Sequence, residues 1–210
     1  MPDPLDAEIE KLLRRAAAAD WAAIDQLLQM HRPRLRRMVA VHMDPRLSAR
    51  VDASDVVQEA LLQASRKMPQ YLRDRPLPFY PWLRQIAWER LVHLHEVHIG
   101  TAKRGVGREA AGRMKLPDDS VLELAERLVA HTSNPSGRVL RDEMRHRVHA
   151  ALVQLSPGDR DVLVLRYLEQ LQIKEIAAIL GITEGAATKR HVRGLERLRN
   201  VLEGQSEQCS

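Results

Sequence analysis

Four cationic side chains lie close together near the C-terminus, in a segment with helical periodicity. Arg190, Arg193 and Arg197 recur at intervals of three and four residues, and Lys189 adjoins them. Side chains at that spacing share one side of an α-helix, where they can bind phosphates and the acceptor atoms of bases in the major groove of DNA. We assign Lys189 and Arg190 to base or near-base contacts. Arg193 and Arg197 are assigned to the phosphate backbone, with a merely solvated helix face as the alternative.

The element that must position these cations is a pair of helices joined by a tight turn. Residues 173–180 carry apolar side chains at helical spacing, and Gly181 can adopt the conformation that ends a helix sharply. Thr183 can cap the second helix, and it stands among the residues expected to meet DNA. Gly194, inside the second helix, indicates tight packing or a local bend. This is a helix-turn-helix pattern, which is typical of proteins that bind duplex DNA.

A second group of charged residues is acidic. Asp52, Asp55 and Glu59 are separated by three and four residues, so their carboxylates lie on one side of the helix that Asp52 is expected to cap. Such a surface can meet a basic protein surface, where complementary charge fixes orientation and speeds encounter. The alternative is that these acids only favour the helix N-terminus through its dipole.

Aromatic and cationic side chains occur together in residues 79–90. An aromatic face can stack on an unpaired base of opened DNA. Trp82 lies on the apolar stripe of its helix and is interpreted as core, whereas Trp88 falls outside that stripe and is a candidate for exposure. Tyr80, in the proline-rich entry to the helix, is the other aromatic candidate. Arg84 and Arg90 add positive charge near the same site.

The sequence gives little support for a metal site or for an enzyme active site. His93, His95 and His98 are spaced so that adjacent members point to different sides of a helix, and no cysteine or arranged carboxylate completes a metal shell. The sequence has no glycine-rich phosphate loop, no nucleophile elbow and no paired catalytic acids. We therefore expect no metal, no cofactor and no enzymatic activity.

Composition favours an all-α protein in a reducing compartment. The 210 residues are 44% apolar with one Phe, three Tyr and three Trp, so the core must consist mostly of aliphatic side chains. A formal charge of +5 fits a polyanion partner. Cys209 is the single cysteine, which excludes an intramolecular disulfide. No stretch approaches the roughly 20 apolar residues of a membrane span, and we expect a cytoplasmic protein without membrane insertion.

Helical runs and breakers divide the chain into two helical domains joined by a flexible linker. In the first domain, Pro33 interrupts one helical pattern, and a later run continues from Asp52 to about Lys67. Glycine and proline break up the segment between the domains, where we expect a short helix at Val121 to Val129. The second domain opens with a long helix from about Arg138 to Leu155, and Ser156 then caps the next helix. We expect the boundaries 1–99, 100–134 for the linker, 135–204 and a polar tail 205–210.

Three separated motifs resemble those of a known family. They are Asp52-Ala-Ser-Asp-Val-Val-Gln-Glu59, Phe79-Tyr-Pro-Trp-Leu-Arg-Gln-Ile-Ala87, and the region from Leu155 to Arg199. In this order they are similar to motifs of bacterial RNA polymerase sigma factors of the extracytoplasmic-function (ECF) group. The resemblance implies a promoter-specificity subunit with core RNA polymerase and promoter DNA as partners, and an anti-sigma factor as a candidate further partner.

The same resemblance implies a role for each motif. The first domain would be sigma region 2 and the second domain sigma region 4, with its helix-turn-helix. The residues expected to dock on the polymerase are Asp52, Asp55, Gln58 and Glu59. Those expected at the −10 element are Tyr80, Arg84, Trp88 and Arg90, and those expected at the −35 element are Thr183, Lys189, Arg190, Arg193 and Arg197.

Two other interpretations remain open. A stand-alone helix-turn-helix regulator would bind an operator tightly without polymerase, usually at a two-fold symmetric site. A helical adaptor that binds only protein would leave the arginines of residues 190–197 without a role.

Overall fold

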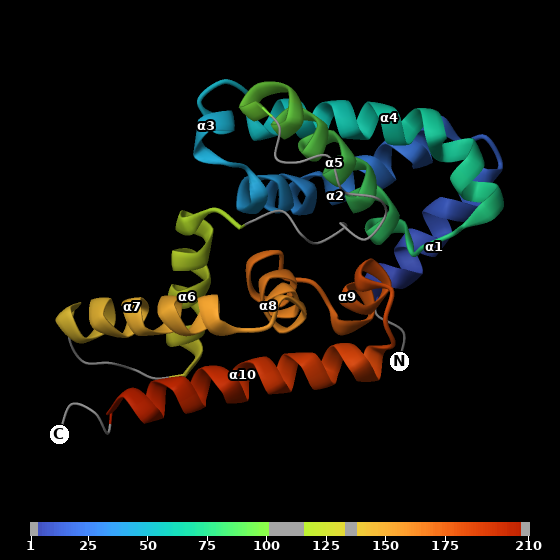
Figure 1. Cartoon of the computed structure of the whole chain (residues 1–210). Helices are drawn as coiled ribbons and strands as arrows, with labels where there is room; N and C mark the ends of the chain where they lie inside the picture. Colours follow the sequence, from blue (N-terminus) through green and yellow to red (C-terminus); the bar gives the residue numbers. More distant parts are fainter. Residues whose placement is uncertain (1–3, 101–115, 133–137, 207–210) are drawn as a thin grey trace. The chain divides into compact units, whose positions relative to one another are not determined.

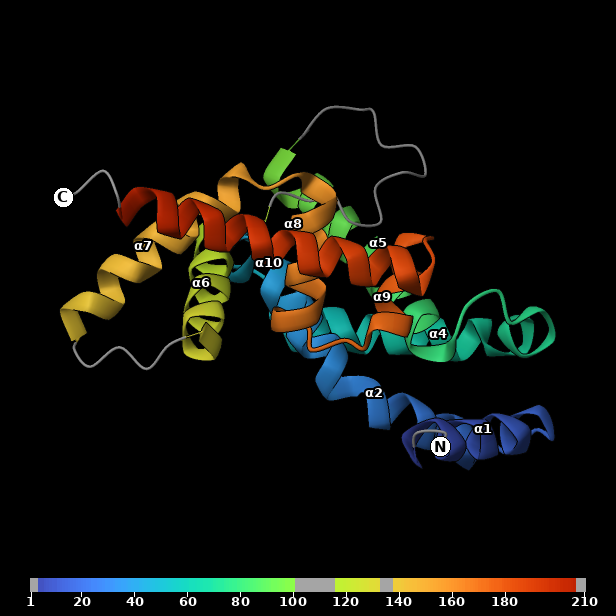
Figure 2. The same ribbon diagram turned by 90° about the horizontal axis from the view of Figure 1, so that it is seen from below.

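The computed structural model describes residues 4–100, 116–132 and 138–206, and throughout these ranges the chain is helical or in turns, without a β-strand (Figures 1 and 2). The all-α prediction is therefore confirmed. The chain divides into two compact units, Met1–Gly105 and Val106–Ser210. Within the described ranges, no helix has both the length and the apolar character needed to cross a membrane.

The first unit is built around three packed helices. These are α2 (Trp21–His42), α4 (Ala53–Asp74) and α5 (Phe79–His95), each of which packs against the other two. The helix α1 (Pro4–Ala17) covers α2 and α4, the short α3 (Pro45–Ser48) follows α2, and the π-helical turn η1 (Glu96–Gly100) extends α5. Fully buried aliphatic side chains, among them Leu27, Leu35, Met38 and Leu83, form its core.

Side chains cap two of these helices, at Asp20 and, as the sequence predicts, at Asp52. The carboxylate of Asp20 accepts a hydrogen bond from the N–H of Ala23 at 3.2 Å, and α2 begins one residue after Asp20. Asp52 accepts from the N–H of Ser54 at 2.6 Å, and α4 begins at Ala53. Each bond satisfies one of the backbone donors that the first turn of a helix leaves unpaired.

Proline residues interrupt the first unit less than the sequence predicts. The expected break at Pro33 is wrong, because α2 runs through this residue to His42. His31 and Leu35, two residues before and after it, are both buried, so packing on either side holds the helix together despite the missing hydrogen bond. Likewise α4 continues past Lys67, through Pro69, to Asp74.

The second unit contains the helix-turn-helix. Its elements are α6 (Asp118–Thr132), α7 (Arg138–Gln154), α8 (Pro157–Leu163), the π-helical turn η2 (Val164–Leu168), α9 (Ile173–Leu180) and α10 (Glu184–Ser206). The long α10 packs against α7, α8 and α9, and α6 packs against α7 and η2 (Figure 1). Ser156 caps α8 as predicted, since its hydroxyl accepts from the N–H of Asp159 at 3.3 Å.

The helix α6 lies in the range that the sequence assigns to a linker. A short helix was expected over residues 121–129, and the structure extends it to Asp118–Thr132. Its apolar side packs into the second unit, with Leu124 and Ala125 fully buried. Arg127 donates from Nη1 to the carbonyl of Tyr167 at 2.9 Å. This part of the predicted linker is therefore a packed helix, whereas residues 101–115 and 133–137 lie outside the described residues.

Candidate docking and nucleic-acid interfaces

The first turns of α4 present the predicted acidic surface. Asp55, Gln58 and Glu59 are all exposed and lie on one side of the helix. Asp52 is exposed too, but its carboxylate caps α4, and the hydrogen bond from the Ser54 N–H lowers the pKa of that carboxyl. Asp52 therefore stabilises the helix terminus, whereas Asp55, Gln58 and Glu59 face solvent, and their role in docking stays a prediction.

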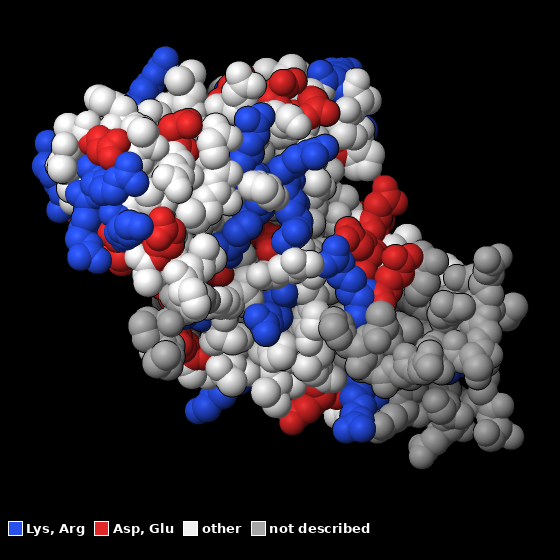
Figure 3. Space-filling view, turned by 180° about the vertical axis from the view of Figure 1, so that it is seen from behind, with Lys and Arg blue, Asp and Glu red and all other residues white. Residues whose placement is uncertain are grey.

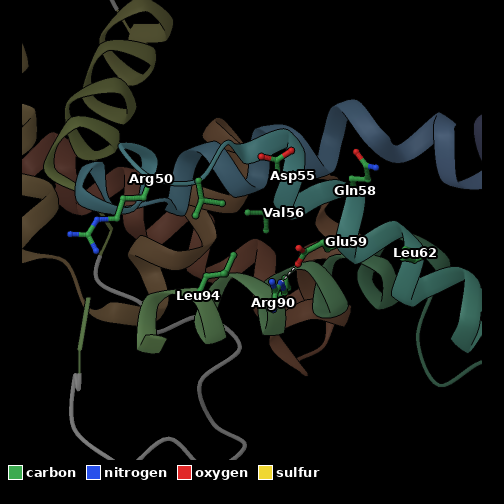
Figure 4. A pocket seen from close by; sticks show the side chains of 9 residues that line it. Arg50, Asp55, Val56, Gln58, Glu59, Leu62, Arg90 and Leu94 are labelled. Carbon is green, nitrogen blue, oxygen red and sulfur yellow. Dashed lines mark ion pairs between the residues drawn. The ribbon is translucent and has the colours of Figure 1, made fainter. Parts of the chain in front are cut away.

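These residues border a shallow cleft of about 440 Å³ (Figure 4). Glu59 forms an ion pair with Arg90 of α5 across the cleft, as the dashed line in Figure 4 marks. Leu62, one turn beyond Gln58 and Glu59, is 55% exposed at its edge. The cleft therefore combines carboxylates with apolar surface. Its lining comes from α4, from α5 and from the turn before α4: Arg50, Val51, Asp55, Val56, Gln58, Glu59, Leu62, Arg90 and Leu94.

Sequence reasoning missed the contribution of Leu62 and Arg50 to this cleft. Leu61 and Leu62 are adjacent apolar residues, and only Leu61 is buried. Since neighbouring side chains on a helix point to different sides, one of the pair had to face away from the core, and this signal was available in the sequence. Arg50 gave no such signal, because its place depends on the turn between α3 and α4.

The residues predicted to read the −10 element are mostly buried. Trp88 is only 5% exposed, and Tyr80 and Arg84 are buried as well. The ring of Trp88 meets the ring of His42 edge-on at 4.9 Å between centroids, and the guanidinium of Arg34 lies 3.7 Å from the ring centroid of Tyr80. The expectation that Trp88 is exposed is therefore wrong, and Tyr80 and Arg84 are not surface contacts in this conformation.

The physical reason is that two helices cover α5. Both α2 and α4 pack against it, so side chains outside its main apolar stripe are also enclosed. Trp82 is core, as predicted, and its ring stacks on that of Tyr71 at 4.3 Å. Of the four predicted −10 residues only Arg90 is partly exposed, and it is paired with Glu59.

The helix-turn-helix has the predicted geometry. Gly181 has φ of 63°, in the left-handed region that favours glycine, and it ends α9. Thr183 accepts from the N–H of Ala186 at 3.1 Å through its hydroxyl and so caps α10. Ala187 and Leu198 are buried and hold α10 against the rest of the unit.

Two of the predicted phosphate contacts have a partner within the protein. The Nε of Arg193 lies 3.0 and 3.1 Å from the carboxylate oxygens of Asp159, and its Nη2 lies 2.5 Å from one of them. Arg197 donates from Nη1 to the same carboxylate at 2.9 Å. Burial opposes the ionisation of Asp159, but bonds from Arg193 and Ser156 and the two arginine charges outweigh it and lower the pKa of this carboxyl. Arg193 and Arg197 are therefore already paired within the protein, and their assignment to the DNA backbone stays a prediction.

The side chains of all three arginines, Arg190, Arg193 and Arg197, turn toward α8. A Cβ on Gly158 would lie 3.1 Å from Nη1 of Arg190, and a Cβ on Gly194 would lie 3.3 Å from Cδ1 of Leu163. Gly194 thus marks tight packing, which is one of the two alternatives that the sequence indicated. Lys189, one turn before Arg193 on α10, is exposed.

The exposed side of α10 includes two residues that sequence reasoning did not select. Thr188 and Val192 are exposed and lie one turn apart, next to Lys189. The hydroxyl of Thr188 donates to the carbonyl of Glu184 at 2.9 Å. An exposed valine on a predicted DNA-binding helix was a usable signal, because apolar side chains contact the methyl group of thymine.

Charges of both signs are interspersed on one face of the molecule. On the face seen in Figure 3, groups of Lys and Arg side chains have Asp and Glu side chains between them.

Among the residues that the structure describes, no group of three or more His, Cys, Asp and Glu is arranged to hold a metal ion. Cys209 lies outside those residues.

Known families match both units. Residues 27–96 match the family described as Sigma-70 region 2, and residues 145–198 match Sigma-70, region 4. Together the two matches span more than half of the chain, and they contain the acidic cleft and the helix-turn-helix respectively. The chain belongs to the RNA polymerase sigma factors, in the ECF group. It is a promoter-specificity subunit that binds core RNA polymerase, recognises promoter DNA and serves transcription initiation.

Individual relatives agree with this assignment. The chain is 28% identical over 194 residues to the ECF RNA polymerase sigma factor SigD of Mycobacterium tuberculosis, a match that covers 92% of this chain and 84% of SigD. It is 28% identical over 197 residues to the ECF RNA polymerase sigma-E factor of Escherichia coli K12, covering 91% and 93% of the two chains. The solved structure of CnrH in complex with the cytosolic domain of CnrY has a similar fold. That match has a TM-score of 0.52 and 22% identity, and it covers 94% of this chain and 98% of CnrH.

Proposed function

We propose that this sigma factor docks on core RNA polymerase through the cleft of its first unit. The observation that carries this proposal is the exposed surface of Asp55, Gln58, Glu59 and Leu62 on one side of α4. Carboxylates around an exposed leucine fit a basic helical surface with an apolar centre, because charge orients the partners and apolar burial holds them. Asp52 contributes by fixing the start of α4.

For the −35 element, we propose that the start of α10 enters the major groove. Thr183, Thr188, Lys189 and Val192 form the exposed side there, and Arg190 lies at its edge. Lys189 can donate to phosphates or guanine, while the methyl groups of Thr188 and Val192 fit thymine. This set leaves out Arg193 and Arg197, because both are paired with Asp159.

For the −10 element, we propose that Tyr80, Arg84 and Trp88 support α5 from beneath. Its exposed side carries Gln85 and Glu89, which are joined by a hydrogen bond of 3.2 Å, and then His93. These polar side chains are the ones available to meet bases. Arg90 serves the docking cleft through its pair with Glu59.

The wider setting follows from this role. The protein performs no covalent chemistry of its own, because the polymerase makes the transcript, and it works in the cytoplasm where bacterial polymerase is found. CnrH forms a complex with the cytosolic domain of CnrY. By analogy we infer that an anti-sigma factor is a further partner of this chain.

The test is run-off transcription with purified core RNA polymerase and fragmented genomic DNA of the encoding organism. We expect discrete transcripts that require this protein and that are lost when Asp55 and Glu59 are both changed to Lys. The matched control is Asp25→Lys, a charge reversal at an exposed position of α2 outside the cleft, which should leave transcripts unchanged. An equal loss with the control would contradict the docking site. Absence of any transcript, together with tight DNA binding without polymerase, would favour a stand-alone regulator.

A further inference from the structure

A buried carboxylate lies beneath the DNA-reading helix. Asp159 is in the first turn of α8, its side chain is 0% exposed, and no sequence motif singled it out. It lies 34 and 38 residues before the two arginines that it binds. Both arginine side chains remain about half exposed, at 51% and 50%. One buried negative charge therefore holds two cations that belong to the surface of α10.

The geometry of this contact fixes the rotation of α10 about its axis. Arg193 bonds through both Nε and Nη2, so its planar guanidinium is held by the fork that carboxylates match best. Gly158 and Gly194 allow α8 and α10 to approach closely at the same level. Rotation of α10 about its axis would break the bonds between Arg193 and Asp159 and would disrupt the close packing at Gly158 and Gly194. Lys189 and Val192 consequently face outward.

The contact with Asp159 limits the hydrogen bonds that Arg193 and Arg197 can donate to DNA phosphates. The Nε and Nη2 donors of Arg193 are those that would bind a phosphate side-on, and Asp159 already occupies them. Releasing both arginines to DNA would leave the fully buried carboxylate of Asp159 uncompensated, which is strongly unfavourable. Counterion release from DNA depends on the number of phosphates that protein cations neutralise. Arg193 and Arg197 should therefore add little to that number.

We propose that Asp159 is a positioning residue of the −35 reading helix. It holds Arg193 and Arg197 against α8, so these arginines orient α10 and do not neutralise DNA phosphates, whereas Lys189 does. This inference rests on the proposed binding of α10 to the −35 element. Lys189, Arg193 and Arg197 thus have two different roles, DNA binding and helix orientation, although all three lie on α10.

The test measures how promoter binding by the reconstituted holoenzyme depends on salt, using a promoter fragment recovered by the run-off experiment. The slope of log affinity against log salt concentration changes by about 0.9 for each phosphate contact, which corresponds to about 3.5-fold in affinity between 50 and 200 mM salt. We expect Lys189→Ala to make the slope shallower by about 0.9. Arg193→Ala and Arg197→Gln should lower affinity at every salt concentration and leave the slope unchanged.

The decisive variant is Asp159→Asn, which keeps the shape and removes the charge. We expect its slope to be steeper by about 0.9 to 1.8, because one or both released arginines now reach phosphates. Adding Arg193→Ala to Asp159→Asn should reverse at least part of this gain. A residue that merely supported the fold would weaken binding without making the slope steeper, and that outcome would overturn the proposal.

Two further outcomes keep the conclusions separate. If Asp159→Asn does not fold, Arg197→Gln decides alone, since a slope shallower by about 0.9 means that Arg197 binds phosphate and the proposal fails. In that case the −35 function of α10 stands. If Lys189→Ala, Arg193→Ala and Arg197→Gln all leave binding unchanged, α10 does not bind DNA, and the −35 function and this inference fail together.

Discussion

His31 is a titratable residue that lies buried in the first unit. The residue is 1% exposed, and the centroid of its ring lies 5.3 Å from that of Phe79 and 5.5 Å from that of Tyr80. Within the described part of the chain, neither ring nitrogen has a hydrogen-bond partner. Burial, and after it the charge of Arg34, lowers the pKa of His31 to about 4. The imidazole is therefore neutral in the folded protein at physiological pH.

This predicts a loss of stability in weak acid. Between pH 6.5 and pH 4 the unfolded chain takes up a proton at His31 that the folded chain refuses, so the free energy of unfolding falls as pH falls. Relative to pH 7, we expect a loss of about 2 kcal/mol at pH 5 from this residue. Urea unfolding followed by tryptophan fluorescence measures it in the first unit, because Trp21, Trp82 and Trp88 all lie there.

The matched variant is His31→Leu, which removes the titrating group. It should lose this part of the pH dependence while other titrating groups keep theirs. An equal change in stability from pH 7 to pH 5 in both proteins would mean that His31 is not buried as a neutral ring.

At the scale of elements, the turn between α9 and α10 depends on one backbone conformation. Gly181 has φ of 63°, where a side chain is strained, although no heavy atom lies within 4 Å of the place where its Cβ would be. Gly185, inside α10, has equally open surroundings but ordinary helical geometry. A comparison of substitutions at the two glycines therefore separates the effect of backbone strain from that of steric contact.

We expect opposite effects when each is changed to alanine. Gly181→Ala should destabilise the second unit by about 1 kcal/mol because of the left-handed backbone. Gly185→Ala should stabilise it by about 0.5 to 1 kcal/mol because alanine is the better helix former. Hydrogen exchange of amides in α9 and α10 under native conditions reports both changes, and destabilisation by both variants would contradict this account of the turn.

The proline inside α2 gives a second test at this scale. Pro33 is exposed, so its replacement leaves no cavity, while the N–H that it lacks would complete the helix. We expect Pro33→Ala to stabilise the first unit by about 1 to 3 kcal/mol. A shift of the tryptophan-monitored urea midpoint to higher concentration would show it. An unchanged or lower midpoint would mean that packing around Pro33 requires the proline.

At the scale of the whole molecule, each unit has a core of its own. Leu83 is fully buried in the first unit and Leu152 in the second. Truncation of a buried leucine to alanine usually costs about 2 to 5 kcal/mol, from lost burial and from the cavity that remains. A truncation in one core should therefore lower the stability of its own unit and leave that of the other unit unchanged.

We therefore expect two distinguishable unfolding transitions. Leu152→Ala should move part of the circular dichroism transition of the full chain to lower urea and leave the tryptophan transition in place. Leu83→Ala should move the tryptophan transition. If Leu152→Ala shifted tryptophan fluorescence equally, the chain would unfold as one cooperative body.

Much of this protein can be predicted from its sequence, because the signals are local. A capping side chain and the donor that it meets are two or three residues apart, as at Asp20, Asp52 and Thr183. The left-handed turn at Gly181 needs only the residue without a Cβ. Apolar periodicity likewise predicts helices and their order, which suffices for the all-α class and for the helix-turn-helix.

Only the tertiary structure decided which side of each helix faces solvent. Trp88 is enclosed because α2 and α4 cover α5 from different directions, and helical spacing within α5 carries no information about them. Arg193 and Arg197 share a side with Arg190 in any straight helix, yet their partner Asp159 comes from another helix 34 and 38 residues away. Spacing along a helix fixes which side chains lie together, and packing between helices fixes what they meet.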